Sequence, residues 1–169
     1  MITDSSFSDN SAIVEGGAIK YNLYRPIITN TTFMNNSASY GADIASYAIK
    51  VVQTDSTANG IELKNVGSGV LYDEVLALQL VDHDENVMVL SNSSQIIISP
   101  STSEQSMLGI VNKKVTQGAV SFDSLFFVSK PGDQNIEFKI TSNAIDSNIL
   151  QLQYGQPSLQ DEISVSFRW

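Results

Sequence analysis

The sequence predicts an all-β protein in two parts, a few coils of a parallel β-helix over residues 1–69 and a β-sandwich-like module over residues 70–169. Three observations predict this fold class. An eleven-residue block recurs after 26 residues near the N-terminus. Short apolar stretches then follow one another at spacings of about ten residues. Only 16% of the residues are charged, and the Ser, Thr and Asn that replace them suit strands and turns better than long helices.

The repeated block occupies residues 2–12 and 28–38. Six of its eleven positions carry the same residue in both copies, and four more are Asp/Asn or Ser/Thr exchanges. A glycine turn follows each copy, first Gly16-Gly17-Ala18-Ile19 and then Gly41-Ala42-Asp43-Ile44. One coil of a parallel β-helix takes about 20–30 residues and advances by about 4.8 Å, so equivalent residues stack. The repeat therefore predicts a stacked scaffold rather than a chemical site.

The positions that recur have structural roles in this interpretation. Phe7 lies over Phe33 as an aromatic stack, and Asn10 lies over Asn36 as an amide ladder at a corner of the coil. The glycines supply backbone angles that other residues resist. The predicted structural residues of the repeat are Phe7, Asn10, Gly16, Gly17, Phe33, Asn36 and Gly41.

These motifs resemble a known repeat. Phe7-Ser8-Asp9-Asn10, followed by Gly16-Gly17-Ala18-Ile19, is similar to the polymorphic outer-membrane protein-type repeat, which combines Phe-x-x-Asn with Gly-Gly-Ala-Ile. Phe33-Met34-Asn35-Asn36 matches the first element again, whereas Gly41-Ala42-Asp43-Ile44 departs from the second. The resemblance covers about residues 2–45. It implies a right-handed parallel β-helix at a cell surface, as in bacterial autotransported adhesins and large surface proteins of some protists.

The rest of the chain predicts strands separated by turns. Residues 47–52 read as a strand that opens a third coil, residues 53–60 as a polar turn, and Gly67-Ser68-Gly69 as the joint between the two parts. In the second part we expect strands at residues 75–81, 87–90, 95–99, 107–111, 119–128, 135–141, 148–154 and 163–167.

The second part also resembles a known module. Leu78-Gln79-Leu80-Val81-Asp82, Gly118-Ala119-Val120-Ser121-Phe122, Lys130-Pro131-Gly132 and Phe138-Lys139-Ile140-Thr141-Ser142 are similar in order to the strands of immunoglobulin-like modules of large surface proteins. The resemblance spans about residues 75–168 and implies an immunoglobulin-like β-sandwich.

Charge and cysteine content narrow the function classes. The net charge is −9 and the only adjacent basic pair is Lys113-Lys114, which argues against a nucleic-acid partner. The sequence has no run of 18 consecutive apolar residues, the length that a membrane-spanning helix needs. There is no cysteine, so packing and backbone hydrogen bonds must hold the fold.

The densest polar cluster is residues 82–86. Asp82, Asp84 and Asn86 offer oxygens at alternate positions, which makes them the weak candidate for a calcium loop, although the glycine and distal glutamate of an EF-hand are absent. A solvated hairpin turn is the simpler interpretation. His83, the only histidine, has no second His or Cys to complete a zinc site. We therefore expect no catalytic residue, no metal site and no cofactor.

These features favour a non-catalytic segment of a large cell-surface or secreted protein, with a stalk or adhesion role and an unknown protein or glycan partner. We expect the chain to be a piece of a larger membrane protein, because two coils do not bury a continuous core. Two alternatives remain. A carbohydrate-binding or carbohydrate-cleaving β-helix would use tyrosine platforms, and an intracellular scaffold module is favoured by the missing signal peptide. The candidate platforms are Tyr21, Tyr24, Tyr40 and Tyr47.

Overall fold

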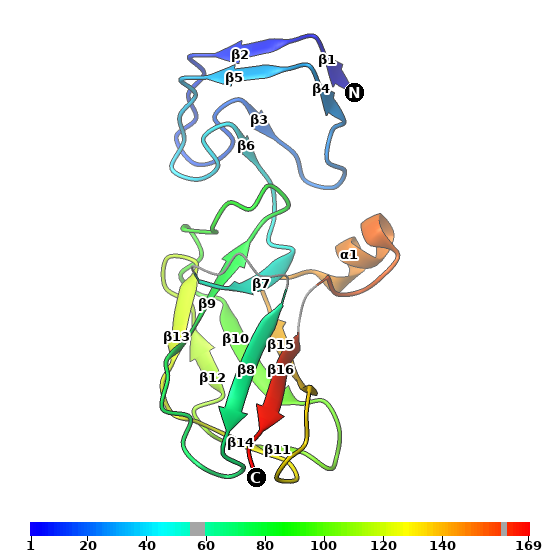
Figure 1. Ribbon diagram of the computed structural model, residues 1–169. Coiled ribbons are helices and arrows are strands. Elements are labelled where there is room, and N and C mark those ends of the chain that lie inside the picture. The colour runs from blue at the N-terminus through cyan, green and yellow to red at the C-terminus, as the bar shows by residue number, and fades with distance from the viewer. Residues whose placement is uncertain (55–59, 160–161) are drawn as a thin grey trace.

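A computed structural model describes residues 1–54, 60–159 and 162–169. Within these ranges the protein is all-β apart from one short helix. Figure 1 shows two stacked coils at one end of the molecule, a group of sheets at the other, and helix α1 beside the level where they meet. Of the polar turn expected at residues 53–60, residues 55–59 lie outside the described part of the chain.

The first repeat copy opens coil one (residues 2–20) and the second opens coil two (residues 28–46). Coil one contains β1 (Ile2–Thr3), β2 (Ser6–Ser8) and β3 (Ile19–Lys20), and coil two contains β4 (Ile28–Thr29), β5 (Thr32–Met34) and β6 (Ile44–Ala45). The pairs β1–β4, β2–β5 and β3–β6 are all parallel. Phe7 pairs with Phe33 and Ile19 with Ile44, which are the partners that the sequence offset predicts.

Acidic and amide side chains mark the corners of the coils. Asp4, Asp9, Asn30 and Asn35 all have φ between 47° and 56°, the left-handed region that Asp and Asn tolerate better than other non-glycine residues. The Asp/Asn exchanges in the repeat thus keep a backbone requirement. A Cβ atom on Gly17 would lie 2.1 Å from the carbonyl oxygen of Ala42, so close approach of the two coils requires glycine there.

Residues beyond coil two form a sheet module, defined here as residues 48–54, 60–159 and 162–169. Its five-stranded sheet has the order β12-β10-β15-β16-β8, in which β16–β8 is the parallel pair. A three-stranded sheet has the order β13-β9-β7, and β11 pairs with β14. The strands are β7 (Lys50–Gln53), β8 (Ile61–Val66), β9 (Leu76–Val81), β10 (Gln95–Pro100), β11 (Ser106–Gly109), β12 (Asn112–Lys114), β13 (Ala119–Phe122), β14 (Leu125–Val128), β15 (Ile136–Ser142) and β16 (Glu162–Phe167).

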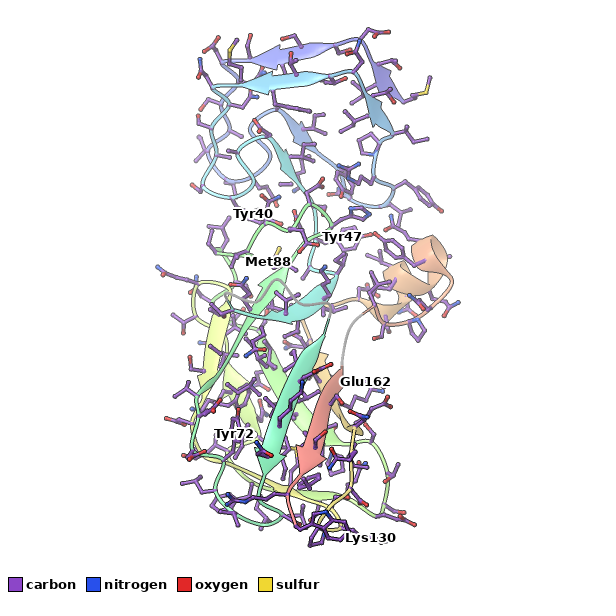
Figure 2. The ribbon with its side chains drawn as sticks, in the orientation of Figure 1. Tyr40, Tyr47, Tyr72, Met88, Lys130 and Glu162 are labelled. Atoms are coloured by element: carbon purple, nitrogen blue, oxygen red, sulfur yellow. The ribbon has the colours of Figure 1, made fainter. Side chains whose placement is uncertain are left out.

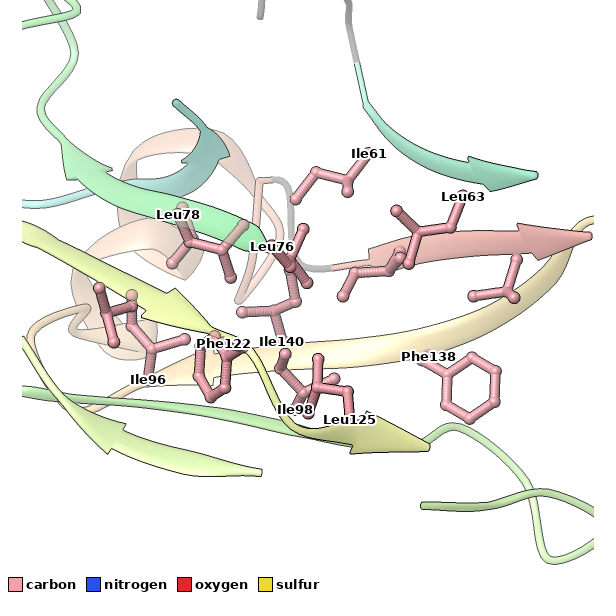
Figure 3. Close-up of a cluster of buried hydrophobic side chains, with 14 of the residues drawn as sticks. Ile61, Leu63, Leu76, Leu78, Ile96, Ile98, Phe122, Leu125, Phe138 and Ile140 are labelled. Carbon is pink, nitrogen blue, oxygen red and sulfur yellow. The ribbon is translucent and has the colours of Figure 1, made fainter. Parts of the chain in front are cut away.

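One apolar core holds these sheets together. Side chains from β8, β10, β15 and β16 meet side chains from β9, β13 and β14, and most are less than 2% exposed. Figure 3 shows part of this cluster, in which Leu76, Ile98 and Phe122 come from three different strands. The Phe127 and Phe138 rings meet edge to face at 5.0 Å between centroids, a favourable aromatic geometry.

Strand pairing differs from the expected organisation before residue 70. β7 does not open a third coil, because it pairs antiparallel with β9 through Lys50 and Val81. β8 also precedes the expected boundary, yet it pairs with β16 near the C-terminus. Both strands therefore belong to sheets of the sheet module.

Three expected strands differ from the structure, one of them along its whole length. Residues 148–154 were expected as a strand, but Ser147–Tyr154 form α1, because Asp146 caps the amides of Asn148 and Ile149 and Gly155 closes the helix with φ 71°. Residues 119–128 split into β13 and β14, and residues 87–90 form a bridge and a turn. Leu150 and Leu152 alternate with polar residues, a pattern that predicts a strand. The capping residues at both ends favour the helix instead.

Candidate functional site at the junction of the coils and the sheets

The loop of residues 82–86 follows β9 in the sheet module and contacts coil two through hydrogen bonds. The Asp82 carboxylate is fully buried. Its Oδ1 accepts hydrogen bonds from the backbone N–H groups of Asp84 and Asn86, both at 2.9 Å. Its Oδ2 accepts from the Tyr40 hydroxyl at 2.5 Å and from the Ser46 N–H at 3.1 Å. One oxygen therefore shapes the loop, while the other fixes the end of coil two.

Asp84 makes a second connection, to the segment that links coil one to coil two. Its Oδ1 accepts from Arg25 Nε at 2.9 Å and Nη2 at 2.6 Å, and its Oδ2 accepts from the Tyr21 hydroxyl at 2.9 Å. The Asp84 side chain is 13% exposed and that of Arg25 is 36% exposed. A two-donor contact of this kind fixes orientation as well as distance.

Further contacts surround the loop. Asn86 Nδ2 donates to the Ile44 carbonyl oxygen at 2.9 Å, and Lys50 pairs with Glu85 at 2.7 Å. The Tyr47 hydroxyl contacts the Leu23 carbonyl oxygen and the Gln153 side chain of α1. Figure 2 shows Tyr40 and Tyr47 at the level where the coils meet the sheet module. Coil two, the sheet module and α1 are thus connected at one place.

Burial keeps the junction tyrosines protonated. It raises the pKa of Tyr40, and the hydrogen bond to Asp82 raises it further. Burial likewise raises the pKa of Tyr21, although its contact with Ser46 acts in the opposite direction. The pKa of Tyr47 rises to about 12, again through burial first. These phenols therefore serve as hydrogen-bond donors rather than as bases.

The repeat residues lie within the coils. The Phe7 and Phe33 rings stack at 5.4 Å between centroids with an interplanar angle of 8°. Asn10 donates through both its backbone N–H and Nδ2 to Asn36 Oδ1, at 3.0 and 2.9 Å. Asn36 Nδ2 in turn donates a hydrogen bond to the Phe7 carbonyl oxygen at 3.0 Å. Gly16 and Gly41 have φ of 66° and 59°, as their turns require.

The weak calcium candidate is a structural connection in this geometry. Asp82, Asp84 and Asn86 do lie together, but the oxygens of both carboxylates accept hydrogen bonds from protein donors. Within the described ranges no group of three or more His, Cys, Asp or Glu residues is arranged to hold a metal ion. The simpler expectation of a solvated turn was wrong for Asp82, because its carboxylate has no exposed surface. His83 stacks on Tyr154 at 5.9 Å between centroids.

The candidate sugar-stacking tyrosines have different surroundings. Tyr21, Tyr40 and Tyr47 each use their hydroxyl in the junction. Tyr24 is the one of the four with a largely exposed side chain, at 66%. No sequence pattern predicts the Tyr40–Asp82 and Arg25–Asp84 pairs, since the partners lie 42 and 59 residues apart with no repeat that relates them.

Coil one is similar to a known repeat family. Residues 4–20 match the Chlamydia polymorphic membrane protein repeat. The matched segment runs from the Asp4 corner to the end of β3, so it corresponds to most of coil one. No curated protein matches the chain. In the described part of the chain, no helix has the length and apolar character needed to cross a membrane.

We predict that Asp82→Ala destabilises the junction by about 3 kcal/mol, because each buried donor left without an acceptor costs about 1–3 kcal/mol. Hydrogen exchange of the Ser46, Asp84 and Asn86 amides measures the effect directly. Asp123→Ala is the matched control, since Asp123 is a mainly exposed acid paired with Lys113. Unchanged exchange at the three amides in Asp82→Ala would contradict the assigned role.

Tyr40→Phe should alter the alkaline stability profile. Folding raises the pKa of Tyr40 above its ordinary value near 10, so above pH 10 the unfolded chain releases a proton that the folded chain retains. This contribution is complete below pH 10 and is lost as the pH rises toward the folded pKa. We expect the fall in unfolding free energy between pH 10 and 12 to be shallower in Tyr40→Phe by up to about 1.4 kcal/mol per pH unit. Urea titrations followed by circular dichroism measure it, and parallel profiles would disprove the assignment.

Proposed function

We propose that the chain is a non-catalytic segment of a cell-surface or secreted protein, with a stalk or adhesion role within a larger, membrane-anchored parent. One observation carries the proposal. The segment that matches the polymorphic membrane protein repeat is coil one, and an equivalent coil stacks on it with the same residue types in register. Repeats of this kind build extended structures in which each unit contacts its neighbours.

The proposed architecture is a right-handed parallel β-helix that ends on an immunoglobulin-like β-sandwich. Three parallel strand pairs and the Asn10–Asn36 ladder support the β-helix. The five-stranded sheet, the three-stranded sheet and the β11–β14 pair pack around one apolar core, which supports the sandwich. The pairing of β7 with β9 favours a division between β6 and β7 rather than at residue 70.

The junction supports a stalk role in particular. A stalk transmits position only if its parts keep a fixed orientation. Relative motion is the default at domain interfaces that are not large and apolar, so a polar interface has to hold its parts by specific contacts. Here Asp82 and Asp84 connect the loop to three different places in the coils and their link, namely Tyr40, Ser46 and the pair Tyr21 and Arg25. The junction is thus a set of directional hydrogen bonds rather than a flexible linker.

Surface location is tested on cells that make the parent protein. Antibodies raised against the purified chain should label intact cells, because the proposed segment faces the outside. Permeabilised cells serve as the reference for total antigen, and an antibody against a known internal protein serves as the control for intactness. Labelling that requires permeabilisation would overturn the surface assignment.

The stalk role predicts a narrow distance distribution between the two ends of the molecule. The chain has no cysteine, so Ser8→Cys in β2 and Lys130→Cys in the sheet module provide two unique positions for spin labels. We expect electron–electron distance measurements to give a single narrow peak for this pair.

Adding Asp82→Ala to the labelled pair should broaden the peak, whereas adding Asp123→Ala should leave it unchanged. A broad distribution in the otherwise unaltered labelled protein would show that the two parts move independently, and the stalk role would then fail.

A further inference from the structure

Coil one has a paired edge and an open edge. Its strands pair with coil two, and among the described residues β1, β2 and β3 have no strand on their other side. The N–H groups of Asp4 and Asp9 donate to the carbonyl oxygens of Thr29 and Met34. Backbone groups alternate in direction along a parallel strand. The N–H and C=O groups of Ser8, which precedes Asp9 in β2, therefore face away from coil two. Such an edge can accept a further strand.

At the corners, hydrogen-bond donors and acceptors are divided unequally between the two coils. Asn30 Nδ2 donates to Asp4 Oδ1 at 2.5 Å, and Asn35 Nδ2 donates to Asp9 Oδ1 at 3.3 Å. In both ladders coil two supplies the amide donor and coil one supplies the carboxylate. An ionised carboxylate only accepts hydrogen bonds and has about four acceptor positions, so each one retains acceptor capacity for another layer.

A third corner points the same way. Asn10 uses its N–H and Nδ2 on Asn36, while no hydrogen bond in the described structure ends on Asn10 Oδ1. Asn36 of coil two shows how such a ladder continues, because its Oδ1 accepts a hydrogen bond from the Asn10 side-chain amide of coil one. The open edge of coil one therefore presents acceptors at the positions of Asp4, Asp9 and Asn10.

We propose that the open edge of coil one is a docking surface for a further parallel coil that carries Asn, and not Asp, at the two positions aligned with Asp4 and Asp9. This inference rests on the proposed β-helix. An Asn coil supplies the amide donors that the carboxylates lack. An Asp coil places like charges one coil spacing apart, about 4.8 Å, and leaves acceptor facing acceptor.

Charge argues against a second copy of the same chain on this edge. Two copies that meet edge to edge would bring the Asp4 and Asp9 carboxylates of both copies into one interface, with no amide donor between them. The net charge of −9 adds to this repulsion. The surface thus fits a donor-bearing coil better than it fits itself.

The test adds one coil to the full chain. A copy of residues 2–27 is inserted before Ile2, so that each added residue aligns with its equivalent in coil one. In the amide version the copy carries Asp4→Asn and Asp9→Asn, and in the acid version it keeps both aspartates. The two proteins differ only at these two positions, so the acid version is the matched control.

The readout is hydrogen exchange of the Ser6 and Ser8 amides in the original coil one, corrected for intrinsic rates. At pH 7 and low salt we expect the amide version to slow exchange about tenfold more than the acid version. Asp4→Asn with Asp9→Asn in the original coil should remove the difference.

Each outcome has a distinct meaning. Equal protection by both added coils at pH 7 would overturn the amide preference and leave the β-helix in place. Protection by neither coil would overturn the docking surface together with the proposed β-helix. Light scattering that shows a dimer of the unaltered chain, broken by a Ser8→Arg change on the open edge, would show that a second copy occupies the surface instead.

Discussion

The buried Asp82 carboxylate is the interaction on which the arrangement of the two parts depends. A carboxylate without exposed surface is tolerated only when donors surround it. Two of its donors belong to its own loop, at Asp84 and Asn86, and two belong to coil two, at Tyr40 and Ser46. The loop and coil two therefore both supply donors to the same carboxylate. A change in either one would leave the carboxylate exposed or without its hydrogen-bond donors.

The coils are held by stacking rather than by long strands. Their strands contain only two or three residues each, so backbone pairing alone fixes little of the coil. Side-chain ladders at the corners and the Phe7–Phe33 stack supply the rest. The Asp/Asn exchanges between the coils meet two demands at once. Both residue types tolerate the left-handed backbone, and an Asn next to an Asp forms a hydrogen bond that two aspartates cannot form.

The sequence predicted what repeats and missed what occurs once. The pairing of Phe7 with Phe33 follows from a regular offset, because each coil advances by one strand spacing. The Tyr40–Asp82 contact joins residues 42 positions apart with no pattern between them, so only the folded chain reveals it. Residues 148–154 show a third case. Their alternation suggests a strand, while the caps at Asp146 and Gly155 favour the helix that forms.

The distribution of donors and acceptors then explains how an acidic chain stacks its layers. Coil two donates through Asn30 and Asn35 to the carboxylates of coil one, and through Tyr40 and the Ser46 N–H to the carboxylate of Asp82. At these positions coil two supplies the donors, and the carboxylates on either side of it supply the acceptors. Because the acidic groups on either side face neutral amides and hydroxyls rather than one another, the layers approach to hydrogen-bonding distance despite a net charge of −9. The same alternation makes the open edge of coil one, which ends in acceptors, selective for what stacks on it.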